Sequence, residues 1–112
     1  MKTNAALKLH SIEDMVQELQ HWGYDFTEAE VLSWLRSRGY LVGEAGERYN
    51  APSELCLELH WMTQTRSFTH GGGGRLHLEL RPMFTETGWE RVMPKLTRYA
   101  RNRDEDNHDL RD

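Results

Sequence analysis

The chain has 112 residues, of which 38% are hydrophobic and 29% are charged, and its formal net charge is -4. This length suits a single compact domain, and no apolar run approaches the roughly 20 residues of a membrane-spanning helix. Cys56 is the single cysteine, which excludes an internal disulfide and any zinc site that needs two thiolates. The start of the chain lacks the apolar stretch of a signal peptide, so we expect a cytoplasmic protein.

The charge is unevenly distributed along the chain. Residues 81–103 contain six Lys or Arg and two Glu, whereas the last nine residues contain five Asp or Glu and one Arg. The basic segment carries a secondary stripe that could contact phosphates: Arg91, Lys95, Arg98 and Arg101. From Asn102 onward there is no apolar periodicity. We therefore predict one domain over 1–101 and a disordered acidic tail over 102–112.

Two short amphipathic helices are expected near the start of the chain. Apolar residues recur at three- and four-residue steps over 12–22, and again from Glu28 until Gly39. Each stretch follows a capping-box pattern, formed by Ser11 with Asp14 and by Thr27 with Glu30. Only five residues connect them. The pair therefore predicts a helix-turn-helix or a simple helical hairpin.

The middle of the chain is ambiguous between helix and strand. After Gly39, a short β-type run and a polar loop precede Pro52, which suits the first turn of a helix. In that helix Leu55 and Leu59 would face inward. The same residues also alternate as in a strand. We favour a short helix that gives way to a strand near His60.

A β-hairpin and a closing helix follow. Segments 61–68 and 75–80 are typical of strands, and they flank a glycine-rich tip at 69–74. The second strand is expected to direct its leucines toward the core: Leu76, Leu78 and Leu80. Thr85 caps the last helix, which Pro94 should kink. The predicted fold is α+β, a winged helix-turn-helix with a β-hairpin wing and a closing C-terminal helix.

Three short motifs occur in order along this predicted fold. They are Leu35-x-x-x-Gly39-Tyr40-Leu41, Asn50-x-Pro52 and Thr85-x-x-Gly88. With the helix pair before them, they cover about residues 11–97. This pattern resembles the C-terminal (KilAC) domain of phage antirepressors. The resemblance implies a winged-helix fold and a phage or prophage regulatory role in a bacterial host cell.

DNA binding is the first functional hypothesis. A winged helix usually sets its second helix in the major groove and its hairpin against the backbone. The candidate contact residues are Ser33, Trp34, Arg36, Ser37 and Arg38 on the second helix, with Arg66, His70 and Arg75 on the hairpin. Arg36 and Arg38 could reach guanine edges or phosphates. Glu28 and Glu30, at the start of the same helix, would repel phosphate.

Protein binding is the alternative. The same surface would then bind a repressor, or a host defence protein that acts on nucleic acid, and the domain would be an inhibitor. Four tryptophans are many for this length, and tryptophan is favoured at interfaces, including those of a possible homodimer. Trp34 lies at the edge of the apolar stripe, where it either forms part of an interface or seals the core.

Metal and catalytic sites are not expected. The six histidines and Cys56 form no compact set of three or four ligands in the sequence. Cys56 has no obvious partner base, and the glycine run lacks the Lys-Ser/Thr of a phosphate-binding loop. We therefore expect no enzyme activity, no cofactor and no metal.

Overall fold

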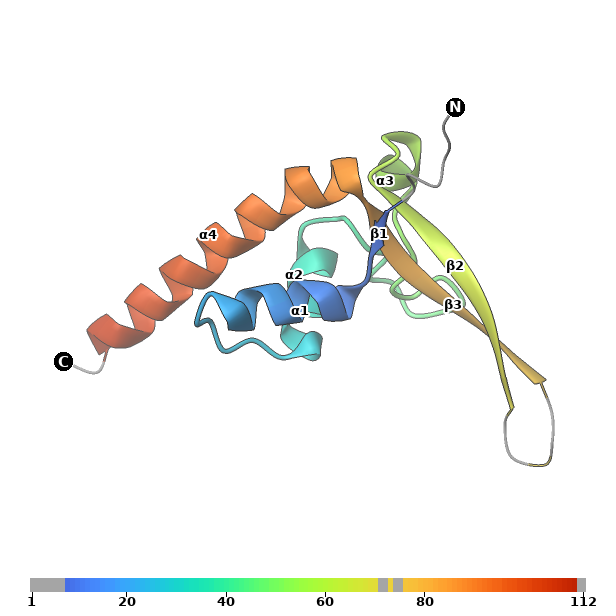
Figure 1. The fold of residues 1–112 in the computed structure, drawn as a ribbon, viewed down its shortest axis with the longest axis horizontal. Helices are drawn as coiled ribbons and strands as arrows, with labels where there is room; N and C mark the ends of the chain where they lie inside the picture. The colour runs from blue at the N-terminus through green and yellow to red at the C-terminus, as the bar shows by residue number, and fades with distance from the viewer. Residues whose placement is uncertain (1–7, 71–72, 74–75, 111–112) are drawn as a thin grey trace.

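The computed structural model describes residues 8–70, 73 and 76–110, and this part of the chain is an α+β fold (Figure 1). Its elements are β1 (Leu9–His10), α1 (Ile12–His21), α2 (Glu28–Ser37), α3 (Glu54–Glu58), β2 (Met62–His70), β3 (Leu76–Thr85) and α4 (Glu86–Leu110). The strands form one antiparallel sheet in the order β1-β3-β2. No helix in these described ranges has the length and apolar content needed to span a membrane.

The two capping boxes set the starts of α1 and α2, as the sequence predicts. The Ser11 hydroxyl accepts the Asp14 backbone N–H at 3.0 Å, and the Asp14 carboxylate accepts the Ser11 N–H at 2.8 Å. Thr27 and Glu30 repeat the exchange at 3.2 and 2.9 Å. These reciprocal bonds satisfy N–H groups that the first turn of a helix leaves unpaired. The helix starts are therefore encoded locally.

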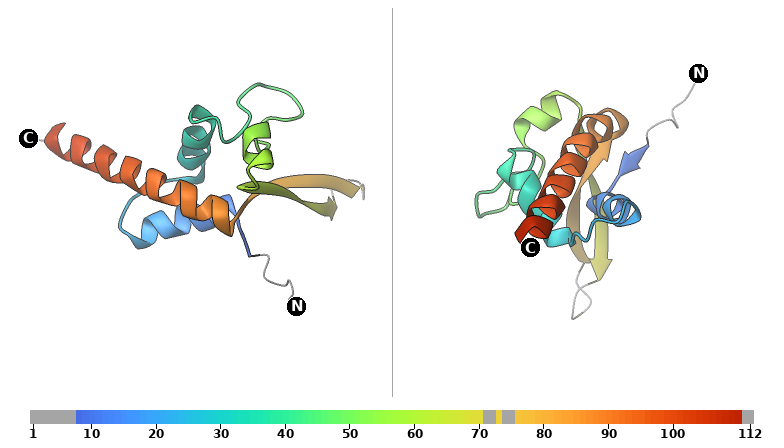
Figure 2. Two further views of the ribbon diagram at one scale, coloured as in Figure 1. Left: turned by 90° about the horizontal axis from the view of Figure 1, so that it is seen from above. Right: turned by 90° about the vertical axis from the view of Figure 1, so that its left-hand side faces the viewer.

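The core lies where the two short helices and the first half of α4 meet the base of the sheet (Figure 2). Met62 of β2 and Phe84 of β3 are directly opposite each other and buried. α1 and α2 bury their apolar stripes against this base. In the centre of α4, Val92, Met93 and Leu96 are buried, whereas Tyr99 is 39% exposed.

The expected inward leucines of α3 are exposed, so that prediction is wrong. Leu55 and Leu59 are 58% and 43% exposed, and the helix buries Cys56 instead. Pro52 does not form the first turn, because it makes a β-bridge with Leu41, and Ser53 caps the helix. A helix of five residues has only one face to bury, and here that face carries Cys56. The predicted change to a strand near His60 is confirmed, since β2 begins at Met62.

The prediction that Leu76, Leu78 and Leu80 face the core is also wrong. Their exposed fractions are 63%, 51% and 47%. The strand alternation is as expected, because the register from Phe84 back to Leu76 is unbroken and places these leucines on the Phe84 face. However, the hairpin extends beyond the helices, as Figure 1 shows, so no helix in the described ranges covers that face.

β3 passes into α4 without a loop, and the Thr85-x-x-Gly88 motif makes this junction. The Thr85 hydroxyl accepts the Gly88 N–H at 3.1 Å and donates to the His60 carbonyl at 2.7 Å. A Cβ at Gly88 would lie 1.9 Å from the Trp61 carbonyl oxygen, so only glycine allows this approach. The motif therefore joins the first turn of α4 to the start of β2.

The predicted disordered tail is helical where the structure describes it. α4 continues without a break to Leu110, past Pro94 and past the predicted boundary at residue 101. Arg103 extends the packed part of the helix through contacts with the α1–α2 connection, which no local periodicity reveals. Residues 95–110 also contain neither Gly nor Pro, so nothing in the backbone ends the helix earlier.

Candidate partner-binding surface

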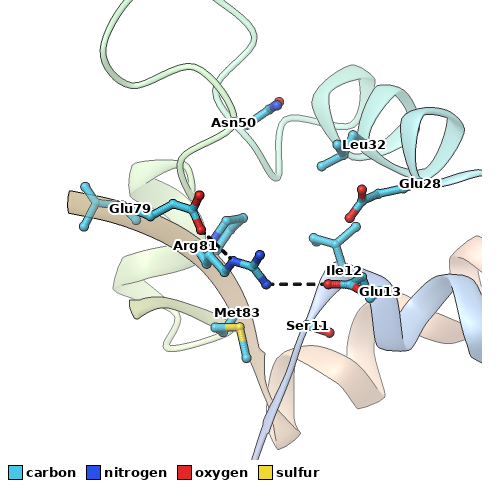
Figure 3. A pocket seen from close by; sticks show the side chains of 11 residues that line it. Ser11, Ile12, Glu13, Glu28, Leu32, Asn50, Glu79, Arg81 and Met83 are labelled. Carbon is cyan, nitrogen blue, oxygen red and sulfur yellow. Dashed lines mark hydrogen bonds and ion pairs between the residues drawn. The ribbon is translucent and has the colours of Figure 1, made fainter. Parts of the chain in front are cut away.

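A groove of about 590 Å³ lies between the helix pair and the inner half of the hairpin (Figure 3). Its walls come from the start of α1, the start of α2 and β3. The lining residues are Ser11, Ile12, Glu13, Glu28, Leu32, Asn50, Glu79, Leu80, Arg81, Pro82 and Met83. A volume of this size is within the range of about 300–1,000 Å³ typical of ligand sites. The lining of the groove mixes apolar and charged side chains.

The charge of this groove is negative. Glu13, Glu28 and Glu79 supply three carboxylates, and Arg81 supplies one guanidinium. Arg81 already pairs with Glu79 at 3.2 Å and with Glu13 at 3.5 Å, as the dashed lines in Figure 3 show. Glu28 extends toward the same space from α2. The net charge of the lining therefore favours a cationic ligand over a phosphate.

Trp34 of α2 seals the core. It is 5% exposed, and its ring lies 5.9 Å from the Tyr40 ring and 6.0 Å from the Tyr99 ring, centroid to centroid. Of the two possibilities for Trp34, an interface residue or a residue that seals the core, the structure supports the second. A large aromatic side chain that packs between two others contributes to stability rather than to a free surface.

Arg36 holds the loop that follows α2. Its Nη1 donates to the Asn50 Oδ1 at 2.7 Å, and its guanidinium carbon lies 5.0 Å from the centre of the Tyr49 ring. Asn50 has a left-handed backbone with φ of 66°. A charge-assisted hydrogen bond and a cation–π contact occupy the guanidinium. Contact with a guanine would require Arg36 to give up these partners.

Ser33, Ser37 and Arg38 line a second hollow, of about 500 Å³, between α2 and α4. The Ser37 hydroxyl donates to the Trp34 carbonyl at 2.7 Å, and the Arg38 guanidinium carbon lies 5.5 Å from the Trp34 ring centre. Ser33 and Arg38 are exposed. The structure therefore brings these three predicted residues together beside α4, and not beside the hairpin.

Arg103 closes one end of this second hollow. Its Nη1 pairs with Glu30 at 2.7 Å, its Nη2 donates to the Asp25 carbonyl at 2.9 Å, and its guanidinium carbon lies 3.7 Å from the Phe26 ring centre. The Thr27 backbone N–H, and after it the Arg103 guanidinium, lower the pKa of the Glu30 carboxyl. The repulsive charge that the sequence analysis assigned to Glu30 is thus partly neutralised within the chain.

The predicted hairpin residues are only partly described. Arg66 on β2 is exposed. The side chain of His70 and the whole of Arg75 lie outside the described residues. The basic cluster predicted at the hairpin tip therefore stays a prediction.

The predicted basic stripe occupies the outer face of α4. All four of its side chains are exposed: Arg91, Lys95, Arg98 and Arg101. They recur at three- and four-residue steps on the side of the helix away from Val92 and Leu96, which are buried. They form a separate surface from the groove beside the hairpin.

Ligand-type side chains do not gather elsewhere in the described ranges. No three His, Cys, Asp or Glu side chains there are placed to hold a metal ion. Cys56 is buried, and burial raises the pKa of its thiol. A low-pKa thiolate is the reactive form of cysteine, so Cys56 is not placed as a nucleophile.

Sequence reasoning missed the groove. Glu13 is far from Glu79 and Arg81 along the chain, and the strand face that carries Glu79 and Arg81 is expected to be solvated. One local observation could have indicated part of it: Glu79 and Arg81 alternate on one face, the spacing of a same-strand ion pair.

Comparison with known proteins gives no relative of this chain. No protein-family model matches it, and neither a curated protein nor a solved structure is significantly similar.

Proposed function

We propose that this chain is a non-enzymatic regulatory module of the winged-helix type that binds a basic protein through the groove between the helix pair and the hairpin. The element order supports the winged-helix assignment. A short strand precedes the helix pair, it joins the hairpin in the order β1-β3-β2, and a closing helix follows. In this arrangement α2 would be the recognition helix and β2–β3 the wing.

The charge of the groove carries the proposal for a protein partner. In a winged helix that binds DNA, the space between recognition helix and wing faces phosphates. Here this space presents Glu13, Glu28 and Glu79, and its one guanidinium is already in two ion pairs. Carboxylates within about 8 Å of phosphate are repelled at physiological salt. A partner with a positive surface would be attracted instead.

The resemblance to antirepressor domains suggests what such a partner does. Repressors and defence proteins that act on nucleic acid carry basic surfaces for their substrate. An acidic groove complements such a surface. The module would then act as an inhibitor, by covering the basic residues that its partner needs for nucleic acid.

The experiment compares two probes on the full chain at low salt: a fluorescent decalysine peptide and a 20-base-pair DNA duplex. We expect the peptide to bind, and the variant Glu13→Gln/Glu28→Gln/Glu79→Gln to bind it about tenfold more weakly, since each exposed ion pair contributes several tenths of a kcal/mol. The matched control changes three exposed glutamates elsewhere, Glu44→Gln/Glu47→Gln/Glu58→Gln, and should retain affinity. Equal loss in both variants, or a preference for the duplex, would reject the proposed groove.

DNA binding is the second candidate, and the basic stripe on α4 favours it. Arg91, Lys95, Arg98 and Arg101 are exposed on one helix face, and phosphate contacts of this kind depend strongly on salt. If the stripe binds DNA, the affinity for a duplex would fall when all four stripe residues are changed to Gln. The affinity would not change in Arg36→Ala. Insensitivity to the four-residue change would exclude the stripe.

A further inference from the structure

The side of β3 that faces away from β2 has backbone groups without a strand partner. Thr85 donates its N–H to the Trp61 carbonyl at 3.0 Å, whereas the Trp61 N–H donates to the Cys56 carbonyl, so the single bond from Thr85 shows that the backbone of Thr85 faces the β2 side. Antiparallel pairing alternates, and the register continues without a bulge from Phe84 to Leu76. Odd-numbered residues of β3 therefore direct their N–H and C=O toward β2. Even-numbered residues direct theirs to the opposite side.

β1 covers only the first part of this opposite side. It pairs His10 with Phe84 and Leu9 with Thr85, and ends there. In the described part of the chain, no strand lies beside Leu80 or Leu78, whose side chains are also about half exposed. Pro82, between them and Phe84, has a carbonyl but no N–H. An uncovered strand edge with apolar side chains is a template for pairing with another chain.

This edge forms one wall of the acidic groove. β3 contributes Glu79 to Met83, a stretch of about 14 Å at about 3.4 Å per residue. Glu13 and Glu28 approach from the opposite wall, where Ile12 and Leu32 lie beside them (Figure 3). An extended segment inserted here would have backbone partners on one side and carboxylates on the other.

We infer that the groove binds its partner by strand addition: an extended segment of alternating basic and apolar residues pairs with the Leu78–Pro82 edge of β3. This inference rests on the proposed function and adds the mode of recognition. Main-chain hydrogen bonds to Leu78 and Leu80 supply affinity that is independent of sequence. The alternating apolar residues extend the exposed leucine row, and the basic residues complement Glu13, Glu28 and Glu79. A helical basic segment would use the charges but not the edge.

The test is an amide-resolved NMR titration of the full chain with acetyl-(Lys-Val)4-amide. Strand addition predicts that the amides of Leu78 and Leu80 shift and become protected from hydrogen exchange. The amides of Glu79 and Arg81, which already face β2, should change little. The matched probe acetyl-(Glu-Val)4-amide has the same apolar residues and the opposite charge, and should not bind.

Two changes remove the backbone bonds while keeping the charges. Two versions of the Lys-Val peptide are made, one with methylated Lys nitrogens and one with methylated Val nitrogens. One of the two should bind the protein about fivefold more weakly or worse, the value of one lost hydrogen bond. On the protein, Leu78→Pro removes an outward N–H at the same parity as Pro82, whereas Leu78→Ala keeps it. We expect Leu78→Pro to bind more weakly than Leu78→Ala, with the fold of each checked by its amide spectrum.

The outcomes separate this inference from the proposed function. If decalysine binds and depends on the three groove glutamates, but the Leu78 and Leu80 amides do not respond to the Lys-Val peptide, strand addition is wrong and the basic-partner proposal stands. The same conclusion follows if both methylated peptides bind as tightly as the parent. If neither basic peptide binds, the proposed function fails, and strand addition fails with it.

Discussion

Replacing Arg103 by alanine should destabilise the whole domain, although Arg103 lies beyond the boundary at residue 101 that the sequence predicts. The change removes three contacts: the ion pair with Glu30, the hydrogen bond to the Asp25 carbonyl and the cation–π contact with Phe26. The partly exposed ion pair contributes about 0.2–1 kcal/mol, and the cation–π contact about 0.5–1 kcal/mol. With about 0.5–1.5 kcal/mol for the hydrogen bond, the expected loss of unfolding free energy is about 1–3 kcal/mol.

Urea denaturation followed by circular dichroism measures this loss. With a slope of about 2 kcal/mol per molar urea, the midpoint should fall by about 0.5–1.5 M at an unchanged slope. Arg101→Ala removes a similar side chain from the exposed face of the same helix, and should change the free energy of unfolding by less than about 0.5 kcal/mol. Arg103→Lys keeps the charge and loses the planar guanidinium, so it should fall between the two. Equal midpoints for Arg103→Ala and Arg101→Ala would refute the reasoning.

The difference in unfolding free energy between the wild type and Arg103→Ala should depend on pH. In the folded chain the pKa of Glu30 is lowered, first by the Thr27 N–H and then by Arg103. A lowered folded pKa gives stability that is complete above the unfolded value, about 4.3, and is lost as the pH falls through the folded value. The difference between the wild type and Arg103→Ala should therefore be constant at neutral pH and narrow below about pH 4.3. It should not vanish, because the contacts with Asp25 and Phe26 do not titrate.

Three further results are expected. Gly88→Ala should destabilise the domain by about 2 kcal/mol or more in a thermal melt, because the added Cβ would meet the Trp61 carbonyl. A typical exposed glycine-to-alanine change within a helix instead stabilises by up to about 1 kcal/mol. An unchanged melting temperature would contradict the junction geometry. Arg36→Ala should release the 43–51 loop and speed trypsin cleavage after Arg48, while Arg38→Ala should leave the cleavage rate unchanged. Cys56 should react with a thiol reagent in the native state far more slowly than in urea, because it is buried and its thiol pKa is raised; equal rates would show that the site opens readily.

Local sequence patterns predict where α1, α2 and α4 begin. The starts of α1 and α2 depend on side chains three residues apart, so Ser11 and Thr27 identify them without knowledge of the fold. The Thr85 cap of α4 is encoded in the same way. Each of these interactions is complete within four residues, the range over which a capping pattern is informative.

What the sequence could not predict depends on which layers meet. Alternation placed Leu76, Leu78 and Leu80 on the correct face of β3, but the extent of the helical layer decides whether that face is covered, and here it ends short of them. Arg103 and Glu30 are 73 residues apart, so no periodicity relates them. The groove could not be predicted for the same reason, because Glu13 and Glu79 become neighbours only once the hairpin lies beside the helix pair.

The position of β1 in the sheet determines when this chain can finish folding. β1 is the first described element, yet its partner is the end of β3, and His10 contacts Glu86 across 76 positions. A ribosome that releases the chain from its N-terminus therefore exposes β1, α1 and α2 long before the residues that complete their sheet and core emerge. Pairings between such distant segments are slow, because the entropy of closing the intervening loop is lost before the contacts form. During synthesis the helix pair is therefore made before the residues that complete its core, and we expect the pairing of β1 with β3 to be a late step of folding.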